Sequence, residues 1–419
     1  MASARTPVPT DAARSRQRPL QAPPAVPRHR RCRRHGPAGR APGLVAGAAV
    51  NPPGPWARLR PTLALDLPLL LCIALLLATG LVTVYSAAAD FPGRFAAQLR
   101  NVGIALGILW LAANVPPRQL MRCAPAVYGI GVLMLLAVQF AGVNKKGATR
   151  WLYVGFDFQP SEIMKIAMPL MLAWFFHHYR GAPRMQTFAA AAVLLALPVG
   201  LIMKQPDLGT ALLVLAAGFY VIVLAGLSWR ALLGLAVAGI VAIPLSWPLL
   251  HDYQRHRVMT LLNPDADPLG KGFQIKQAGI AIGAGGVSGQ GWLAGTQGHL
   301  GFVPERSTDF IFSVFAEEFG LAGNCVLLGL YFLLILRGLQ ITAGAATPFS
   351  RLLTGAVTMI LFTYAFINIG MVSGIFPVVG VPLPFISYGG TALMTLGLGC
   401  GMLMAIRREA LALQRGRLG

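Results

Sequence analysis

The sequence predicts an all-α, polytopic membrane protein with about ten transmembrane helices and one large extracytoplasmic loop. Of the 419 residues, 55% are apolar and only 12% are charged, whereas about 25% of the residues in a typical soluble domain are charged. The mean hydropathy is +0.63. The apolar residues gather in stretches of about 15–25 residues, which is the length that crosses a bilayer as a helix. These values point away from a soluble protein.

Residues 1–60 differ from the rest of the chain. They hold 12 arginines, 11 prolines and one acidic residue. Because they contain few large apolar side chains, they cannot form a core, and we expect a disordered basic tail. The arginine run at residues 28–34 could bind nucleic acid or anionic lipid. A solvated cytoplasmic tail, or an over-extended start site, is the plainer interpretation, and we expect no nucleic-acid partner.

The ten predicted spans follow this tail, within a domain at residues 61–419. In chain order they are Leu67–Ala87, Val102–Val115, Ala126–Ala141, Ser161–Phe176, Thr187–Met203, Leu208–Leu227, Ala231–Leu250, Phe310–Leu336, Leu352–Phe376 and Phe385–Ile406. Most connections between them are short. The exception is the hydrophilic stretch His251–Asp309, and long loops in compact proteins are usually functional or disordered.

The basic residues predict how the chain is oriented. Ten spans place both termini on one side of the membrane. With the termini inside, the short inner loops carry 11 basic residues besides those of the tail, and the short outer loops carry six. Because basic residues gather on the cytoplasmic side, we expect both termini in the cytoplasm and residues 251–309 outside. The basic residues that remain outside indicate an anionic ligand.

Charged residues in or beside the predicted spans are candidates for function, because charges are costly in a membrane. Glu162 and Lys165 are three residues apart on a predicted helix and can pair. An ion pair that only fixes helix packing is an equally good interpretation. Asp207 precedes an apolar run, so we expect its carboxylate to cap a helix.

Asp309 also precedes a predicted helix. The helix dipole would keep its carboxylate ionised, as a general base requires. A helix needs only one capping side chain, however, and Ser307 or Thr308 could provide it. The residues alone therefore leave a capping role and a catalytic role for Asp309 equally open.

Other motifs exclude several classes of site. Residues 283–301 contain eight glycines, which permit either a close approach to a ligand or simple flexibility. The chain has no Walker or dinucleotide-binding pattern. Its five cysteines imply no disulfide framework or metal cluster, and its histidines do not have metal-ligand spacing.

Four segments together carry a resemblance to a known family. They are Met203–Thr210 (MKQPDLGT), Gly291–Gln297 (GWLAGTQ), Pro304–Phe312 (PERSTDFIF) and Pro382–Thr391 (PLPFISYGGT). In this order they resemble the SEDS family of shape, elongation, division and sporulation proteins, over nearly all of residues 67–408. Asn368–Gly374 and Pro377–Pro382 resemble its RodA branch rather than the division branch, FtsW. Ser307 stands where the family often has histidine.

The resemblance implies a peptidoglycan glycosyltransferase of the bacterial cytoplasmic (inner) membrane, which polymerises lipid II on the outer face for cell elongation and rod shape. It also implies a class B penicillin-binding protein as transpeptidase partner within the cell-elongation machinery. It assigns catalysis to Asp309. The candidate supporting residues are Glu162, Lys165, Lys204, Asp207 and Arg306.

The chemistry that the resemblance implies fits these residue types. The donor leaves as a lipid pyrophosphate, which needs fixed positive charge or a divalent cation. The acceptor hydroxyl needs a base. The residues identify no metal ligands and no certain cofactor.

Two other functions are compatible with the pattern of spans. A flippase or other transporter of lipid-linked precursors would also place charges near the membrane midplane, although a large outer loop that carries the candidate base suits surface chemistry better. A scaffold for the cell-wall machinery would tolerate neutralised membrane charges. Gly370 and Gly374, on one face of the ninth predicted span, could receive a partner helix or pack within the chain.

Overall fold

The computed structural model describes residues 65–145, 148–153, 157–179, 183–246, 248, 255, 259–261, 263, 270–299 and 305–418. The predicted basic tail at residues 1–60 lies outside these ranges, so its disorder stays a prediction. Most of residues 247–269, at the end of the seventh predicted span and in the predicted outer loop, also lie outside them.

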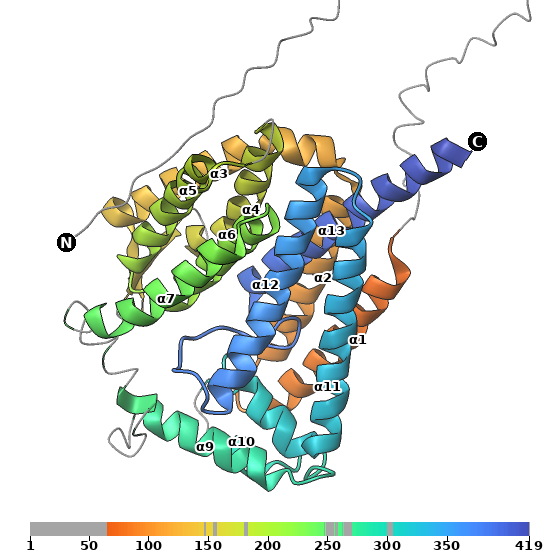
Figure 1. Ribbon diagram of the computed structural model, residues 1–419. Coiled ribbons are helices and arrows are strands. Elements are labelled where there is room, and N and C mark those ends of the chain that lie inside the picture. The colour runs from red at the N-terminus through yellow and green to blue at the C-terminus, as the bar shows by residue number, and fades with distance from the viewer. Residues whose placement is uncertain are drawn as a thin grey trace, which may run out of the picture. The chain divides into compact units, whose positions relative to one another are not determined.

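Ten long helices form the described body (Figure 1), and each of the ten predicted spans overlaps one of them. They are α1 (Leu67–Ala87), α2 (Arg94–Asn114), α3 (Pro117–Ala141), α4 (Pro160–His178), α5 (Met185–Met203), α6 (Leu208–Leu224), α7 (Trp229–Ser246), α11 (Ile311–Ala343), α12 (Pro348–Val372) and α13 (Gly390–Leu418). Within the described ranges, seven are long and apolar enough to cross a membrane, namely α1, α2, α3, α5, α11, α12 and α13. The helices α6 and α7 are shorter and apolar, and α4 has 19 residues.

Helix α12 is the centre of the packing. It contacts α4, α6, α11 and α13, and most of its residues are buried. Around it, α2 packs along α13, α3 packs on α4, and α1 packs on α11. Residues on α12 can therefore reach groups on several other helices.

Three predicted span starts are wrong. Helix α2 begins at Arg94 rather than Val102, because its first turns face protein instead of lipid: Gln98 is buried, and its Nε2 donates to the Ser387 carbonyl at 3.2 Å. Helix α3 begins at Pro117 rather than Ala126, with proline in its first turn, where a missing amide hydrogen costs nothing. Helix α13 begins at Gly390 rather than Phe385.

The last difference arises because residues 373–389 form neither helix nor strand. This stretch, the 373–389 segment, is nevertheless buried at Leu383, Phe385 and Ile386. It lies directly on α1, since a Cβ atom at Gly80 would be 2.5 Å from the Phe385 carbonyl oxygen. The Tyr331 hydroxyl donates to the Pro384 carbonyl at 2.6 Å. Irregular backbone is tolerated at membrane depth where protein surrounds it.

Two short helices belong to the predicted outer loop, α9 (Lys271–Ala284) and α10 (Thr296–His299). Both pack against α11, at the lower end of the body in Figure 1. Three short strands, which no sequence pattern predicts, connect α3 to α4. They are β1 (Val143–Lys145), β2 (Ala148–Tyr153) and β3 (Asp157–Phe158), antiparallel in the order β1-β2-β3.

The glycines after α9 allow the outer loop to contact the backbone of α11. Helix α11 is kinked at Gly320, which has φ 63° and ψ −161°. The kink frees amide groups that the loop satisfies: Leu321 N donates to Gly286 O at 2.9 Å and Ala322 N to Val287 O at 3.0 Å. Of the two interpretations of this glycine-rich stretch, close approach is therefore the one the structure supports, with α11 as the contacted group.

Candidate active site

Asp309 lies in the turn of residues 305–310 that leads into α11, and its side chain is half-buried. The N-cap of α11 is Phe310, which makes no side-chain cap hydrogen bond. Asp309 therefore stands one position before the cap. Neither Ser307 nor Thr308 caps α11, and the Ser307 hydroxyl instead accepts a hydrogen bond from Arg94 Nη1 at 2.7 Å.

The backbone of this turn is held by α12 and by the 373–389 segment. Asn368 of α12 is fully buried. Its Nδ2 donates to the Asp309 carbonyl at 2.8 Å and to the Val381 carbonyl at 2.7 Å. The Ser387 hydroxyl donates to the Thr308 carbonyl at 2.7 Å. Two segments distant in sequence, α12 and the 373–389 segment, thus fix the backbone of the Asp309 turn.

The Asp309 carboxylate faces Gly380. A Cβ atom at Gly380, whose φ is +74°, would lie 3.2 Å from Asp309 Oδ2, so only glycine leaves this space open. The next part of the same segment meets α6, because a Cβ atom at Gly209 would lie 2.6 Å from the Val379 carbonyl oxygen. The segments Met203–Thr210, Pro304–Phe312 and Pro377–Pro382 therefore converge at one place.

Two arginines lie beside the Asp309 turn. Arg306 is buried, donates from Nε to the Ala87 carbonyl at 2.9 Å, and forms an ion pair with the exposed Asp90. The Arg94 guanidinium, besides its bond to Ser307, lies 4.0 Å from the Phe91 ring centroid. The first residue of α2, Arg94, thus brings positive charge to the turn of the candidate base, and Asp90 in the α1–α2 connection pairs with Arg306.

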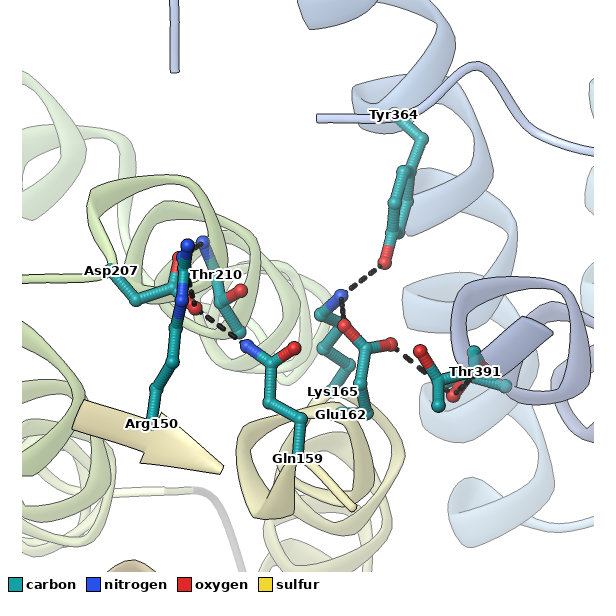
Figure 2. A network of polar contacts seen from close by, with 9 residues as sticks. Arg150, Gln159, Glu162, Lys165, Asp207, Thr210, Tyr364 and Thr391 are labelled. Atoms are coloured by element: carbon teal, nitrogen blue, oxygen red, sulfur yellow. Dashed lines mark hydrogen bonds and ion pairs between the residues drawn. The ribbon is translucent and has the colours of Figure 1, made fainter. Parts of the chain in front are cut away.

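A second polar cluster lies inside the helical body (Figure 2). Lys165 Nζ donates to Glu162 Oε1 at 2.5 Å and to the Tyr364 hydroxyl at 2.7 Å. Glu162 Oε2 accepts a hydrogen bond from Thr395 Oγ1 at 3.5 Å. Glu162 and Lys165 are both buried, and they pair as their spacing predicts. Every charge of this cluster has an opposite charge or a hydroxyl against it.

Asp207 caps α6, as predicted, and also joins α6 to α4. Its Oδ1 accepts from the Thr210 amide at 3.1 Å. Its Oδ2 accepts from Gln159 Nε2 at 2.7 Å and lies 3.7 Å from Arg150 Nη1 (Figure 2). Gln159 is the N-cap residue of α4, so one carboxylate connects the starts of two helices.

Helix α12 joins the two clusters. Tyr364, which binds Lys165, and Asn368, which binds the Asp309 backbone, are four residues apart and so share one helix face. Lys204 belongs to neither cluster. It is exposed at the C-cap of α5, where its side chain makes no ion pair with the described residues.

Asn368, Tyr364 and Arg94 are the site residues that the sequence interpretation missed. A lone carboxamide in an apolar span is a usable signal, since polar groups at membrane depth need partners. Arg94 is one of the outer basic residues that indicated an anionic ligand. Nothing in the sequence separates the Tyr364 hydroxyl from that of any other tyrosine.

Glu317 and Glu318 on α11 contact the outer loop. Glu317 Oε1 accepts from the Gln297 amide at 2.8 Å and from Thr296 Oγ1 at 3.2 Å. Glu318 Oε1 accepts from the Leu293 amide at 3.3 Å. These buried carboxylates thus hold the loop segment Gly291–Gln297. In the described part of the chain, no group of three or more His, Cys, Asp or Glu side chains could hold a metal ion.

Comparisons with known proteins agree with this arrangement. The sequence profile of the FtsW/RodA/SpoVE family, described as cell cycle proteins, matches residues 67–411. The peptidoglycan glycosyltransferase MrdB of Escherichia coli K12 is 50% identical over 345 residues, which cover 82% of this chain and 93% of that protein. MrdB of Helicobacter pylori J99 is 37% identical over 306 residues, or 71% and 79% of the two chains.

Two solved structures share the fold. One chain comes from work on "Structural coordination of polymerization and crosslinking by a peptidoglycan synthase complex"; it has a TM-score of 0.74 and 34% identity, and the match covers 83% of this chain and 99% of that one. The rod shape determining protein RodA of Thermus thermophilus has a TM-score of 0.64 and 32% identity, with 83% and 98% covered. The predicted resemblance and the polytopic helical fold are confirmed.

Proposed function

The chain belongs to the FtsW/RodA/SpoVE family, and we propose that this peptidoglycan glycosyltransferase uses Asp309 as the general base when it polymerises lipid II. The relatives favour polymerisation of glycan strands for cell elongation over the transporter and scaffold functions. They leave open which residues carry out the reaction, and these are assigned from the contacts of the side chains.

The observation that carries the assignment is the position of Asp309 relative to its helix. The carboxylate stands before the N-cap, half-buried, and closely approaches Gly380. Its main chain is fixed by Asn368. A positioned base needs a fixed backbone and access to the reacting hydroxyl, and the bond from Asn368 supports the first of these conditions.

In the proposed reaction, Asp309 takes the proton of the acceptor sugar hydroxyl as that oxygen attacks the anomeric carbon of the donor. The bond from the anomeric carbon to the pyrophosphate breaks, and the configuration inverts. Arg306 and Arg94 place positive charge beside the same turn, where a departing pyrophosphate gains most from it. A divalent cation could add charge there, but no described residues are assigned to hold one.

The other candidate residues take supporting roles. Glu162 and Lys165 neutralise each other inside the body and fix α12 through Tyr364. Asp207 fixes the starts of α4 and α6. We assign Lys204, which is exposed, only to general attraction of the anionic substrate.

Polymer formation from lipid II in detergent, by the chain purified together with the transpeptidase partner proposed below, tests the assignment. Detergent removes the two compartments that a transporter needs. We expect Asp309→Asn to fold normally and to make almost no polymer. Glu305→Gln, which changes a neighbouring carboxylate that Thr308 contacts at 3.0 Å, is the matched control and should be much milder. Near-normal polymerisation by Asp309→Asn would reject the assignment.

We also propose a class B penicillin-binding protein as transpeptidase partner, because one similar chain comes from a peptidoglycan synthase complex. An apolar groove of about 410 Å³ between α11 and α12 offers a surface for a single-span partner. Gly370 lies in this groove but packs against Phe376 of its own chain. Full activity of a chain purified without any penicillin-binding protein would contradict an obligate partnership.

The protein is an integral membrane protein, and we propose that both termini are cytoplasmic. The structure supports a shared side, because Asp66 before α1 lies 3.9 Å from Arg407 near the end of α13. The arginine distribution supports the cytoplasm as that side. A cysteine at Ser288 should react with a membrane-impermeant thiol reagent on intact cells, whereas a cysteine at Arg415 should be protected. The reverse pattern would invert the orientation.

A further inference from the structure

A polar pocket lies at the end of the body opposite the Asp309 turn. The starts of α3 and α12 and the ends of α4 and α13 enclose about 280 Å³. Ser350 in its wall and Asn368 beside Asp309 are separated by 18 residues of one helix, or about 27 Å along the axis. The pocket is therefore separate from the proposed active site.

Two arginines that pair with no other described side chain line this pocket. Arg118 and Arg122 are one turn apart on α3, and both are exposed. Within the described ranges, neither guanidinium makes a hydrogen bond or an ion pair. Nδ1 of His177, at the end of α4, is buried in the wall without a hydrogen-bond partner. The two guanidinium groups thus offer contacts that the described part of the chain does not use.

Two helix dipoles add to this charge. The first turns of α3 and α12 both line the pocket, and each helix has 25 residues. Helix α3 has no side-chain cap, whereas Thr347 caps α12 by accepting from the Ser350 amide at 3.1 Å. The partial positive charge at such helix starts favours phosphate. Together with two arginines on the same wall, the charge points to an anionic ligand that carries phosphate.

The apolar and acidic residues of the pocket favour a phospholipid headgroup over a free phosphate ion. Phe349 and Leu413 give the pocket an apolar side. The pocket also lies at helix ends, where phospholipid headgroups meet the protein. Glu409 contributes one carboxylate, which would repel a simple anion but would attract an ammonium group.

We propose that this pocket binds the headgroup of a membrane phospholipid, with the phosphate at Arg118 and Arg122 and the amine of an ethanolamine headgroup at Glu409. A lipid bound there would connect α3 and α4 to α12 and α13. The proposal does not depend on the assignment of Asp309.

Native mass spectrometry of the delipidated full chain tests this proposal. The protein is titrated with dioleoylphosphatidylethanolamine, with dioleoylphosphatidylglycerol, or with inorganic phosphate. We expect one tightly held phosphatidylethanolamine, and binding that is about 10- to 100-fold weaker in Arg118→Gln/Arg122→Gln, because two charges beside a lipid phosphate are lost. Arg184→Gln/Arg230→Gln removes the same charge from exposed residues at the same end of the body, outside the pocket. This control should bind like the wild type.

Each outcome decides one part of the proposal. Equal binding by the two double variants would overturn it, as would displacement of the lipid by millimolar inorganic phosphate. Glu409→Gln should abolish the preference for phosphatidylethanolamine over phosphatidylglycerol, because it weakens binding of the amine and removes a repulsion from the anionic lipid. A wild-type protein without that preference would overturn the role of Glu409. Thermal unfolding in detergent verifies that each variant is folded.

Discussion

The start of α6 and the start of α11 each carry an aspartate at the same end of the helical body, and the two carboxylates are used differently. Asp207 caps its helix and also binds Gln159 and Arg150. Asp309 precedes a helix whose N-cap is Phe310, and its carboxylate faces Gly380. A carboxylate that binds the backbone of its own helix and two side chains holds structure together, whereas Asp309, one position before the N-cap, does not cap its helix.

The two regions also differ in what fixes them. Around Asp207, the side chain makes the contacts, so substitution should mainly affect stability. Around Asp309, the contacts described reach its main chain, through Asn368. Because the hydrogen bond from Asn368 does not involve the Asp309 side chain, substitution of that side chain should leave this bond in place, and we expect it to affect mainly the reaction.

The strongest test exchanges each aspartate for asparagine. Asp309→Asn removes the proposed base, and loss of a positioned base costs roughly 10²–10⁴-fold in rate, about 3–5 kcal/mol of barrier. Asp207→Asn retains a good capping residue and should polymerise lipid II at nearly the wild-type rate. Rates of glycan synthesis by the purified variants measure both. Equal losses in the two variants would remove the distinction between the regions.

The second test concerns the buried ion pair between Glu162 and Lys165. Lys165→Met leaves Glu162 buried without its opposite charge, and breaking a buried pair in this way typically costs about 3–5 kcal/mol. We expect a lower thermal-unfolding temperature in detergent. The double variant Glu162→Gln/Lys165→Met should recover much of the loss. A stable Lys165→Met protein that makes no polymer would instead place the pair in the catalytic machinery.

A third test separates positioning from catalysis. Asn368→Leu removes both hydrogen bonds that hold the Asp309 and Val381 carbonyls, at a cost of about 1–3 kcal/mol in stability. We expect kcat per folded protein to fall roughly 10- to 100-fold, with KM little changed. Thr363→Val on the same helix, which loses a hydrogen bond to Tyr220, should retain kcat. A normal kcat in Asn368→Leu would show that Asp309 does not need this support.

The sequence predicted the ten spans because a long apolar run has few alternatives to a membrane helix. It also predicted the Asp207 cap and the Glu162–Lys165 pair, since both depend on residues three apart. It failed at the start of α13, where residues as apolar as Phe385 lie in irregular backbone supported by other helices. It could not decide the role of Asp309, because the position of Phe310 as N-cap is set by contacts with distant segments.

A fourth test measures the cap directly. Asp207→Ala removes the acceptor for the Thr210 amide and for Gln159 Nε2. Loss of a helix cap costs about 1–2 kcal/mol, so the unfolding temperature should fall while the rate per folded protein is retained. Asp207→Asn, which retains a capping side chain, is the control, and it should be more stable than Asp207→Ala. A large fall in the rate of folded Asp207→Ala would show that this carboxylate also serves the reaction.

The smallest expected effect involves a third aspartate, Asp66, at the opposite end of the body. Asp66 caps α1 through the Leu69 amide at 3.1 Å and binds Arg337 through both oxygens, at 2.9 and 2.6 Å. Burial alone would raise the pKa of Asp66, but these hydrogen bonds and the charges of Arg337 and Arg407 lower that pKa overall. By its contacts, Asp66 resembles Asp207 rather than Asp309.

The lowered pKa of Asp66 predicts how its contribution to stability changes with pH. Because the carboxyl of Asp66 is more acidic in the folded protein than in the unfolded chain, the unfolded chain takes up the proton first as the pH falls. The stabilisation is therefore complete above the unfolded pKa of about 3.9 and is lost as the pH falls through the folded pKa. Unfolding temperatures of the wild type and Asp66→Asn should differ near neutral pH, begin to converge below about pH 4, and meet below the folded pKa. In an Arg337→Gln background, which lacks the main partner of Asp66, the effect of Asp66→Asn at neutral pH should be smaller, so acidification should change it less. If the wild type and Asp66→Asn still differ in unfolding temperature at low pH, Asp66 stabilises α1 without its charge.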